Sequence, residues 1–351
     1  MAKAILVALF ITLVIGMSLY IGIHFQHKHE NKPNSTHTTL AYNATVSTTA
    51  KLGSYTKIMD AIASAPTYGE SKYYIHVEAG VYVENVYVWK NKTNIALIGD
   101  GAEVTMVTMN RKVPVFDTIE TATVVVEGNG FIAKFITFEN SAGDGAQAVA
   151  LMAMSDNSAF YGCTFLGYQD TLYAKYGRQF YKNCNIYGTV DIVFGDATAV
   201  FQGCNLYARL PNRPITFTAE GREIAQIITG FVLHNCSITA APELQSSKSL
   251  VHAYLGRPWF ELSTVIVMQS FLDSIIEPAG WLDWPGRQTD KVTYREYANW
   301  GPGSATRARV EWLGYAVLNK STDVMPFTVS EFISGDSWIP DTGIPYNSGL
   351  M

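Results

Sequence analysis

The chain of 351 residues carries 48% hydrophobic and 16% charged side chains, which is enough for one large all-β domain or two domains of ordinary size. Its net charge of −5, from 25 basic and 30 acidic residues, argues against a surface that binds nucleic acid or another polyanion. The 28 glycines and the aromatic content of 13% are typical of a turn-rich β protein rather than of a helical bundle.

The chain begins with a segment that directs export. Lys3 is followed by an uncharged and mostly apolar run from Ala4 to Phe25. A cleaved signal peptide usually has an apolar core of about 7–15 residues, whereas a membrane-spanning helix needs about 20. The length of the run, with no clear small-residue cleavage site, slightly favours a signal anchor over a cleaved signal peptide for residues 1–25. In either case we expect the remainder of the chain to be exported.

Residues 26–47 form a predicted polar linker, because they are rich in His, Asn and Thr and show no apolar periodicity. The histidines of this stretch could suggest a metal site, but without an ordered scaffold solvated side chains are the better interpretation: His27, His29 and His37. Export is consistent with several Asn-X-Ser/Thr glycosylation sequons, each of which is weak on its own: Asn34, Asn43, Asn91, Asn235 and Asn319.

The segment SYTKIMDAIASAP near the front has helical periodicity. It places Ile58, Ile62 and Ala65 on one stripe. Ser54 is the predicted N-cap, and Pro66 ends the helix. We expect this short amphipathic helix to cap the open end of a β structure, whose end strand would otherwise be liable to aggregate.

The middle of the chain contains a repeat. Four segments align on their cysteines, and each has an aromatic-rich run, a short polar break, a cysteine and a second apolar run: AFYGCTFLG, QFYKNCNIYG, AVFQGCNLYA and GFVLHNCSITA. The first three cysteines follow at nearly equal intervals and the fourth after a longer one, at Cys163, Cys184, Cys204 and Cys236. Upstream, FIAKFITFENSA has the same rhythm without a cysteine. A period of about 20 residues with short β-type runs predicts a β-solenoid in which each repeat is one coil of parallel strands.

An antiparallel sandwich is the competing fold, because it also gives short strands. It has no reason, however, to keep one pattern in register at a nearly constant interval. In the solenoid, the longer interval between Cys204 and Cys236 is a coil with an inserted loop, which we assign to LPNRPITFTAEGRE.

Four cysteines in an exported chain suggest disulfides. Stacked coils bring cysteines one coil apart into bridging range, and a Cys184–Cys204 bridge would close the loop that carries Asp191. The alternative is a ladder of buried free thiols, which for Cys163 and Cys236 is equally plausible.

The same period predicts a polar column. Gln147 precedes Gln169, and Asp170 precedes Asp191, by close to one period, so these side chains should stack on three successive coils. Two carboxylates at close range rarely both stay charged, so one is protonated or one is held by a cation. Such a pair suits a general acid beside a nucleophile or base, and two nearby amides can donate to a developing oxyanion.

Arg257 in LGRPW is the candidate cation for this column, and Trp259 is a candidate platform for a sugar ring. Structural explanations stay open at this point, because polar ladders also occur inside solenoids and Arg257 could pair with a surface carboxylate. The sequence has no GxSxG elbow, no HExxH motif and no close Cys/His cluster for zinc. We therefore expect no metal and no cofactor.

Five blocks, in order, resemble the plant pectin methylesterases: QAVAL, GYQDTLY, GTVDIVFG, LGRPW and EPAGWLDWPG. The similarity extends from about Leu52 to Leu350 and includes GVYVENV and GSATRARVEWLGY. Family members fold as right-handed parallel β-helices, so the resemblance implies this all-β fold, capped by the short helix, for a catalytic domain at residues 48–351. It also implies hydrolysis of the methyl esters of pectin, with release of methanol, in modification of the cell wall.

The resemblance also implies roles for individual residues. Asp191 matches the family nucleophile, which attacks the carboxymethyl ester carbon, and Asp170 matches the general acid, which protonates the leaving methanol and then activates water. Gln147 and Gln169 match the oxyanion donors. Arg257 matches the residue that keeps the nucleophile ionised. Trp259 matches an aromatic residue that contacts the sugar, and Thr118 aligns less securely with a threonine that contacts substrate. Cys184 and Cys204 match a family disulfide.

The chain departs from the family pattern in three places. The family usually has TAQGR where this chain has TAEGR, which puts Glu220 near the groove, where its charge would disfavour demethylated, anionic pectin. The following EIAQIITG lacks the usual Asp-Pro-Asn-Gln insert, so this groove wall is changed. With no inhibitor-like helical region ahead of the catalytic domain, the sequence resembles the short members of the family.

Another β-helix enzyme acting on pectin, a polygalacturonase or a pectate lyase, is the alternative function, since glycoside hydrolysis also uses paired carboxylates. A lyase would usually need an acidic cluster for calcium, which is not found near Asp170, and two Gln donors favour an ester carbonyl. A non-catalytic homologue that only binds wall polysaccharide is a third interpretation. The expected partners are pectin and a proteinaceous pectinesterase inhibitor. We expect a monomer in the cell wall or extracellular space, which would be tethered to the membrane if the N-terminal segment stays uncleaved.

Overall fold

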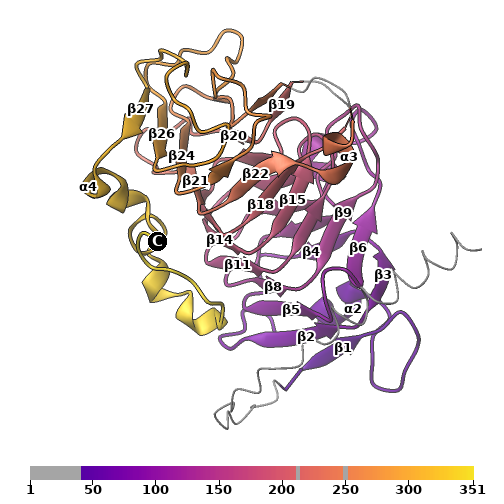
Figure 1. Ribbon diagram of the computed structural model, residues 1–351. Helices are drawn as coiled ribbons and strands as arrows, with labels where there is room; N and C mark the ends of the chain where they lie inside the picture. Colours follow the sequence, from indigo (N-terminus) through magenta and orange to yellow (C-terminus); the bar gives the residue numbers. More distant parts are fainter. Residues whose placement is uncertain (1–40, 211–213, 248–251) are drawn as a thin grey trace, which may run out of the picture. The chain divides into compact units, whose positions relative to one another are not determined.

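The computed structural model describes residues 41–210, 214–247 and 252–351. The predicted targeting segment 1–25 and most of the predicted linker lie outside these ranges. From Tyr42 onward the chain forms one unit. This unit is a right-handed parallel β-helix, as predicted (Figure 1).

Three long parallel sheets make the faces of the β-helix. The largest contains β1 (Ala44–Val46), β2 (Tyr73–Val77), β5 (Ile95–Gly99), β8 (Ile132–Lys134), β11 (Ser158–Tyr161), β14 (Arg178–Lys182), β17 (Thr198–Gln202), β21 (Gly230–His234), β24 (Thr264–Met268), β26 (Thr293–Tyr297) and β27 (Tyr315–Leu318). The six-stranded sheet contains β4 (Val86–Val88), β7 (Val124–Val126), β10 (Leu151–Ala153), β13 (Leu172–Ala174), β16 (Val193–Gly195) and β20 (Thr218–Glu220).

The eight-stranded sheet contains β3 (Gly80–Val83), β6 (Thr105–Met109), β9 (Thr137–Asn140), β12 (Thr164–Leu166), β15 (Asn185–Gly188), β18 (Asn205–Ala208), β22 (Ser237–Ala240) and β25 (Phe271–Leu272). A short pair, β19 (Ile215–Thr216) and β23 (Ala253–Tyr254), completes the pairing. Every pairing between the named strands is parallel, which excludes the antiparallel sandwich.

A left-handed residue makes the corner in front of each cysteine. Gly162, Asn183, Gly203 and Asn235 have φ of 59°, 51°, 66° and 51°. Glycine and asparagine adopt this conformation with the least strain, which explains the short polar break in the repeat. The chain therefore turns in the same way on each coil, and aromatic rings stack inside. Between Phe160 and Tyr181 the ring centroids are 4.7 Å apart, and between Tyr181 and Phe201 they are 4.5 Å apart.

The long coil between Cys204 and Cys236 differs from the prediction. The segment LPNRPITFTAEGRE is not only a loop, because it contains β20, which pairs with β16 and places Glu220 opposite Gly195. The additional residues of this coil lie before and after β20, so the sheet continues through the insertion.

The predicted Cys184–Cys204 disulfide is absent, and all four cysteines are buried free thiols. They occupy the same inner corner on successive coils, and each thiol donates to a carbonyl of the preceding coil. Cys184 Sγ lies 3.5 Å from the oxygen of Phe160, and Cys204 Sγ lies 3.4 Å from the oxygen of Tyr181. Because the side chains are aligned along the stack in this way, the thiol ladder is the arrangement that the chain adopts.

The predicted capping helix is present as α2 (Ile58–Ser64), and Ile58, Ile62 and Ala65 are buried as expected. The predicted N-cap at Ser54 is wrong. The carboxylate of Glu84, from the neighbouring coil, accepts hydrogen bonds from the first helical amides, at 2.8 Å from the Ile58 nitrogen. A capping group supplied through space has no local sequence signature.

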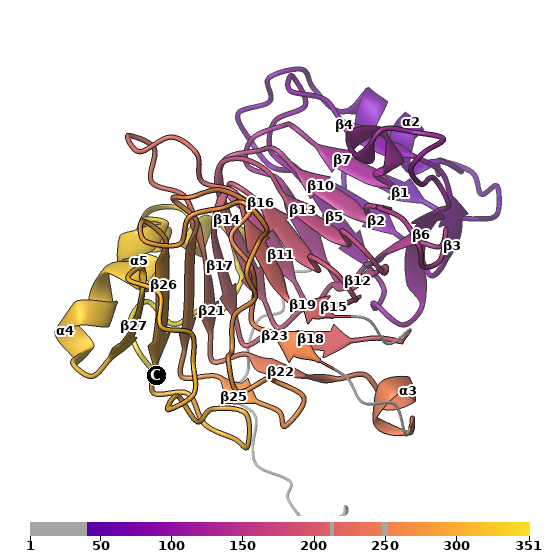
Figure 2. The ribbon, with the colours of Figure 1, turned by 90° about the horizontal axis from the view of Figure 1, so that it is seen from above.

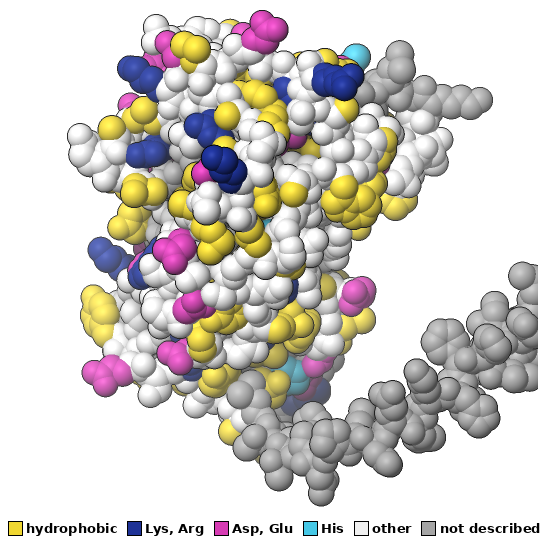
Figure 3. Space-filling model, turned by 60° about the vertical axis from the view of Figure 1, so that its left-hand side comes forward, with side chains coloured by type: hydrophobic (Ala, Val, Ile, Leu, Met, Phe, Trp, Pro, Cys, Tyr) yellow, Lys and Arg dark blue, Asp and Glu magenta, His cyan; other side chains and the backbone are white. Residues whose placement is uncertain are grey.

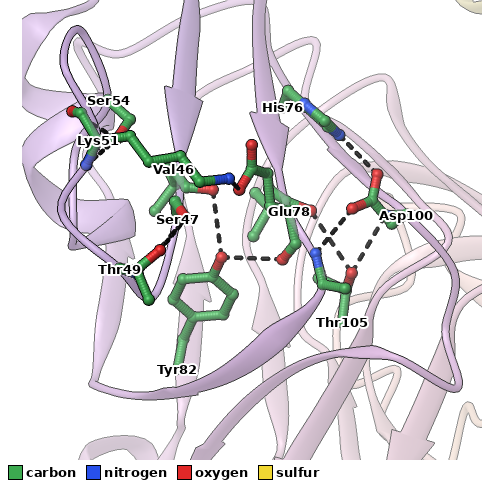
Figure 4. A network of polar contacts seen from close by, with 12 residues as sticks. Val46, Ser47, Thr49, Lys51, Ser54, His76, Glu78, Tyr82, Asp100 and Thr105 are labelled. Atoms are coloured by element: carbon green, nitrogen blue, oxygen red, sulfur yellow. Dashed lines mark hydrogen bonds and ion pairs between the residues drawn. The ribbon is translucent and has the colours of Figure 1, made fainter.

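A polar network secures the first coil (Figure 4). The Tyr82 hydroxyl donates to the carbonyl of Val46 at 3.2 Å, Lys51 pairs with Glu78, and His76 lies 2.7 Å from Asp100. Strand β1 pairs with β2, so the β-helix already includes Ala44 and extends into the range 26–47 that we predicted as linker.

The C-terminal part covers the outer face of the largest sheet with short helices: α4 (Ser321–Val324), η2 (Met325–Phe327), α5 (Val329–Phe332), η3 (Gly335–Ser337) and η4 (Pro340–Thr342). The helices of this segment lie along the sheet in Figure 1. Their apolar side chains pack against residues that point outward from β5 to β24. Two further short helices lie elsewhere: α3 (Pro242–Gln245) contacts β22, and η1 (Thr118–Thr121) lies in the connection between β6 and β7.

None of the helices in the described ranges is long and apolar enough to cross a bilayer. On the face drawn in Figure 3, acidic, basic and apolar side chains are interspersed rather than gathered by charge.

Candidate active site

The six-stranded sheet presents an apolar floor on its outer face. One residue from each of five successive strands lies in register there: Val125, Met152, Tyr173, Phe194 and Ala219. Four of these strands, β7, β10, β13 and β16, follow one another in Figure 2. The rings of Tyr173 and Phe194 stack with centroids 4.1 Å apart. A cavity of about 310 Å³ lies over these two rings and is lined by every predicted site side chain: Thr118, Gln147, Gln169, Asp170, Asp191, Arg257 and Trp259.

The column predicted from the repeat period lies in this cavity. Gln147 and Gln169 face each other across a parallel bridge, and the amide of Asp170 donates to the carbonyl of Val190, next to Asp191, at 3.0 Å. Asp170 and Asp191 have φ of 64° and 51°. Left-handed backbone is unusual for a residue with a side chain, although aspartate tolerates it better than most. Because both aspartates turn the chain in the same way just before a strand, their side chains stack.

Asp191 is held as a carboxylate by a planar cation. Arg257 Nε lies 2.8 Å from Asp191 Oδ1, and the terminal Nη2 lies 2.7 Å from Oδ2. The Thr216 hydroxyl adds a third hydrogen bond to Oδ1 at 2.7 Å, and the Asp191 amide donates back to Thr216 Oγ1 at 2.8 Å. The side chain of Asp191 is only 9% exposed. A two-point guanidinium contact of this kind stabilises the ionised form and fixes the orientation of the carboxylate.

Asp170 has the opposite electrostatic character. Burial raises the pKa of Asp170 well above its ordinary value, and the neighbouring Asp191 carboxylate raises this pKa further, against smaller lowering effects from Arg257 and from a hydrogen bond with Gln169. The geometry therefore favours a protonated Asp170 beside the Asp191–Arg257 ion pair.

Two tryptophans form the wall around Arg257. Trp284 covers the guanidinium with its ring centroid 4.1 Å from Arg257 Cζ, a cation–π contact. Trp259 lies across the cavity, 6.1 Å from Phe194 between ring centroids. Thr118, the least secure assignment from the sequence, lines the same cavity from η1.

Glu220 does not face the cleft, so the prediction that its charge acts on the substrate is wrong. It is the neighbour of Ala219 on β20, and consecutive residues of a strand point to opposite faces. Its side chain is fully buried and accepts hydrogen bonds from the Thr264 amide at 2.6 Å and the Thr229 hydroxyl at 3.0 Å. Burial raises the pKa of Glu220 to about 8, against the lowering effect of these hydrogen bonds.

Sequence reasoning missed several residues that shape the site. Tyr173 and Phe194 are separated by the same interval as Asp170 and Asp191, so the period that found the aspartates also points to them. Trp284 lies in EPAGWLDWPG, and Thr216 lies in a long coil without a clear register. Only the fold brings these two against Arg257 and Asp191.

Known proteins with this sequence pattern are pectinesterases. A family profile described as Pectinesterase matches residues 43–336. Pectinesterase 2 of Citrus sinensis is 47% identical over 302 residues, which cover 85% of this chain and 59% of the citrus protein. Pectinesterase/pectinesterase inhibitor PPE8B of Prunus persica is 46% identical over 302 residues, which cover 84% of this chain and 58% of the peach protein. The chain thus spans less than two thirds of the length of these curated relatives.

Solved structures agree with this assignment. Pectin methylesterase from carrot superposes with a TM-score of 0.87 at 43% identity, over 89% of this chain and 99% of the carrot chain. A pectin methylesterase from Aspergillus niger superposes with a TM-score of 0.71 at 35% identity, over 85% of this chain and 95% of that chain. With a profile match over most of its length and relatives at these identities, the chain belongs to the pectinesterase family.

Proposed function

We propose that the protein hydrolyses the methyl esters of pectin, leaving free galacturonate carboxylates and releasing methanol. The observation that carries the proposal is the pairing of an anionic Asp191, gripped at both oxygens by Arg257, with a buried Asp170 whose pKa is raised well above its ordinary value by burial. This is a nucleophile beside an acid, in a cavity floored by aromatic rings on which a sugar can lie.

In the first half of the reaction, an Asp191 oxygen bonds to the ester carbonyl carbon, and the carbonyl oxygen becomes an oxyanion. The amides of Gln147 and Gln169 line the same cavity and are the donors for this oxyanion. When the tetrahedral intermediate collapses, the bond to the methoxy oxygen breaks. Methoxide takes the proton of Asp170 and leaves as methanol, and Asp191 and the galacturonate carboxyl are joined as an anhydride.

In the second half, the Asp170 carboxylate takes a proton from water, whose oxygen attacks the galacturonyl carbon of the anhydride. The acyl bond to Asp191 then breaks, the pectin chain leaves with a free galacturonic acid carboxyl on the intact polymer, and Asp191 returns as a carboxylate paired with Arg257. Trp259 and Thr118 contact the sugar in this proposal, since both line the cavity beside the aspartates.

We place this activity outside the cell, on wall pectin, on the basis of the N-terminal targeting segment. We further propose that the protein acts as a monomer. Of the sequon asparagines in the described ranges, Asn43, Asn235 and Asn319 are exposed. Several relatives carry the double name pectinesterase/pectinesterase inhibitor. A proteinaceous inhibitor is therefore a second proposed partner, one that would occupy the cleft.

Methanol release from highly methylated pectin tests the proposal directly. The purified protein should release methanol without shortening the polymer, and Asp191→Asn should not. Depolymerisation without methanol would point instead to a polygalacturonase or lyase, and binding without any reaction would point to a non-catalytic wall protein.

A further inference from the structure

The segment that carries Trp284 is attached to the segment that carries Arg257. The Leu255 amide donates to the carbonyl of Gly280 at 2.8 Å, and the Leu282 amide donates to the carbonyl of Gly256 at 3.0 Å. Residues 277–284 thus run beside the two residues that precede Arg257. The position of residues 277–284 therefore sets the position of the Trp284 ring.

A second arginine supports this segment from behind. Arg309 Nη1 donates to the carbonyl of Pro278 at 3.1 Å and to that of Glu277 at 3.4 Å. The next amide, of Val310, donates to the carbonyl of Ala279 at 3.0 Å. Gly280 has φ of 71°, and a Cβ there would collide with Arg309 Cδ, so the guanidinium side chain lies directly against the turn.

Arg309 is itself fixed by a buried ion pair with Glu296 on β26. Arg309 Nε lies 2.8 Å from Glu296 Oε1, and Nη2 lies 3.2 Å from Oε2, with both side chains 2% exposed. The Tyr315 hydroxyl donates to Oε1 at 3.0 Å, and the carbonyl of Gly303 accepts from Nη2 at 2.7 Å. A buried ion pair contributes little net stability compared with an apolar pair of similar volume. Its place behind the Trp284 segment therefore suggests a role in geometry.

We propose that the Glu296–Arg309 ion pair is a positioning device for the nucleophile: it holds residues 277–280 so that Trp284 lies on the Arg257 guanidinium and Arg257 keeps both contacts with Asp191. The inference rests on the proposed role of Asp191 as nucleophile. Neither Glu296 nor Arg309 lines the cavity, so both are positioning residues that act through Trp284.

The test removes both charges together, as Arg309→Met with Glu296→Leu, because removal of one partner alone would leave an unpaired buried charge. On methylated pectin, kcat should fall at least tenfold while KM stays within about twofold, since the defect lies at the reacting carboxylate rather than in sugar binding. The matched control is Lys92→Met. Lys92 is also buried and donates to two backbone carbonyls, those of Ala63 and Ala65, at the far end of the β-helix. Its loss should lower stability without changing kcat.

A double-mutant cycle asks whether the pair acts through the tryptophan. Trp284→Ala alone should lower kcat, and adding the Arg309 and Glu296 changes to it should cost little more, because the positioned ring is already gone. If the two fold-changes multiply, the pair acts on kcat by a route other than Trp284, and the proposal is wrong. If the charge-free variant keeps wild-type kcat while losing stability like the Lys92 control, the pair is only structural.

If the charge-free variant does not fold, Arg309→Lys replaces it. A lysine keeps the charge for Glu296, but its single nitrogen cannot replace the two-point contact with Glu296 and also donate to the carbonyls of Glu277 and Pro278. It should lower kcat severalfold at unchanged KM, and wild-type kcat would overturn the proposal. These outcomes differ from a failure of the proposed function, in which the wild-type protein itself would release no methanol.

Discussion

Replacement of Glu220 by glutamine should make the protein more stable, increasingly so as the pH rises. The wild-type carboxyl is fully buried and accepts hydrogen bonds from the backbone amides of Thr264 and Arg222 and from the Thr229 hydroxyl. Within the described part of the chain it forms no ion pair. A glutamine can keep this pattern, because its carbonyl oxygen can accept from the two backbone amides while its amino group donates to the threonine hydroxyl. The substitution thus removes the ionisation and little else.

The magnitude follows from the pKa. Burial raises the pKa of Glu220 from 4.5 to about 8. A carboxyl whose pKa is higher in the folded state contributes stability that is complete below pH 4.5 and is lost as the pH rises through 8. The full loss is about 5 kcal/mol, of which about 4 kcal/mol falls between pH 5 and pH 9. The glutamine variant, which has no ionising carboxyl at this position, should not show this loss.

Urea unfolding followed by tryptophan fluorescence at pH 5, 7 and 9 measures this difference. The free energies of unfolding of wild type and Glu220→Gln should be similar at pH 5 and should separate at pH 9 by several kcal/mol. The matched control is Glu223→Gln, an exposed neighbour, which should follow the wild type throughout. Parallel pH curves for wild type and Glu220→Gln would show that this carboxyl ionises normally in the folded protein. A change in the KM of Glu220→Gln on partly demethylated pectin would show that Glu220 does face the substrate groove.

Three further substitutions or treatments test the site and the core. Asp191→Asn should abolish methanol release while circular dichroism stays native, since asparagine also accepts the left-handed backbone; a well-folded variant with most of the wild-type rate would contradict the nucleophile assignment. Arg257→Lys should lower kcat more than tenfold, on the order of 1.4 kcal/mol or more of barrier, because lysine cannot grip both carboxylate oxygens; near wild-type kcat would mean that charge alone suffices. Titration with a thiol reagent should find no reactive cysteine in the native protein and all 4 after denaturation without reductant, whereas 2 would indicate the bridge that the sequence suggested.

The column of Gln147, Gln169, Asp170 and Asp191 could be predicted because a parallel coil converts a sequence offset into a position in space. The interval from Asp170 to Asp191 is one coil, so residues at that spacing meet whatever their neighbours are. The same rule holds for the corners and the stacked aromatic rings. It fails wherever a coil gains residues, because the offset then no longer marks a position.

Glu220 illustrates this failure. It lies in the long coil, where nothing in TFTAEGRE marks the register, and a shift of one residue exchanges the groove face for the interior. The Glu84 contact with α2 and the Trp284 contact with Arg257 escaped prediction for another reason. Each joins segments with no periodic relation, and only the folded chain brings them together.

The C-terminal segment has a consequence for how the protein comes apart. A solenoid whose coils touch only their neighbours can fray from either end, one repeat at a time. Here the final residues are bonded to widely separated coils: Lys134 donates to the carbonyl of Thr342 at 2.8 Å, Gln202 exchanges hydrogen bonds with Asn347 at 2.9 Å, and Gln269 bonds to Met351. A coil in the middle of the β-helix cannot open without breaking these contacts with the C-terminal segment. Slow amide exchange should therefore extend, as one cooperative block, over all the coils that the C-terminal segment contacts, rather than decline gradually towards the ends.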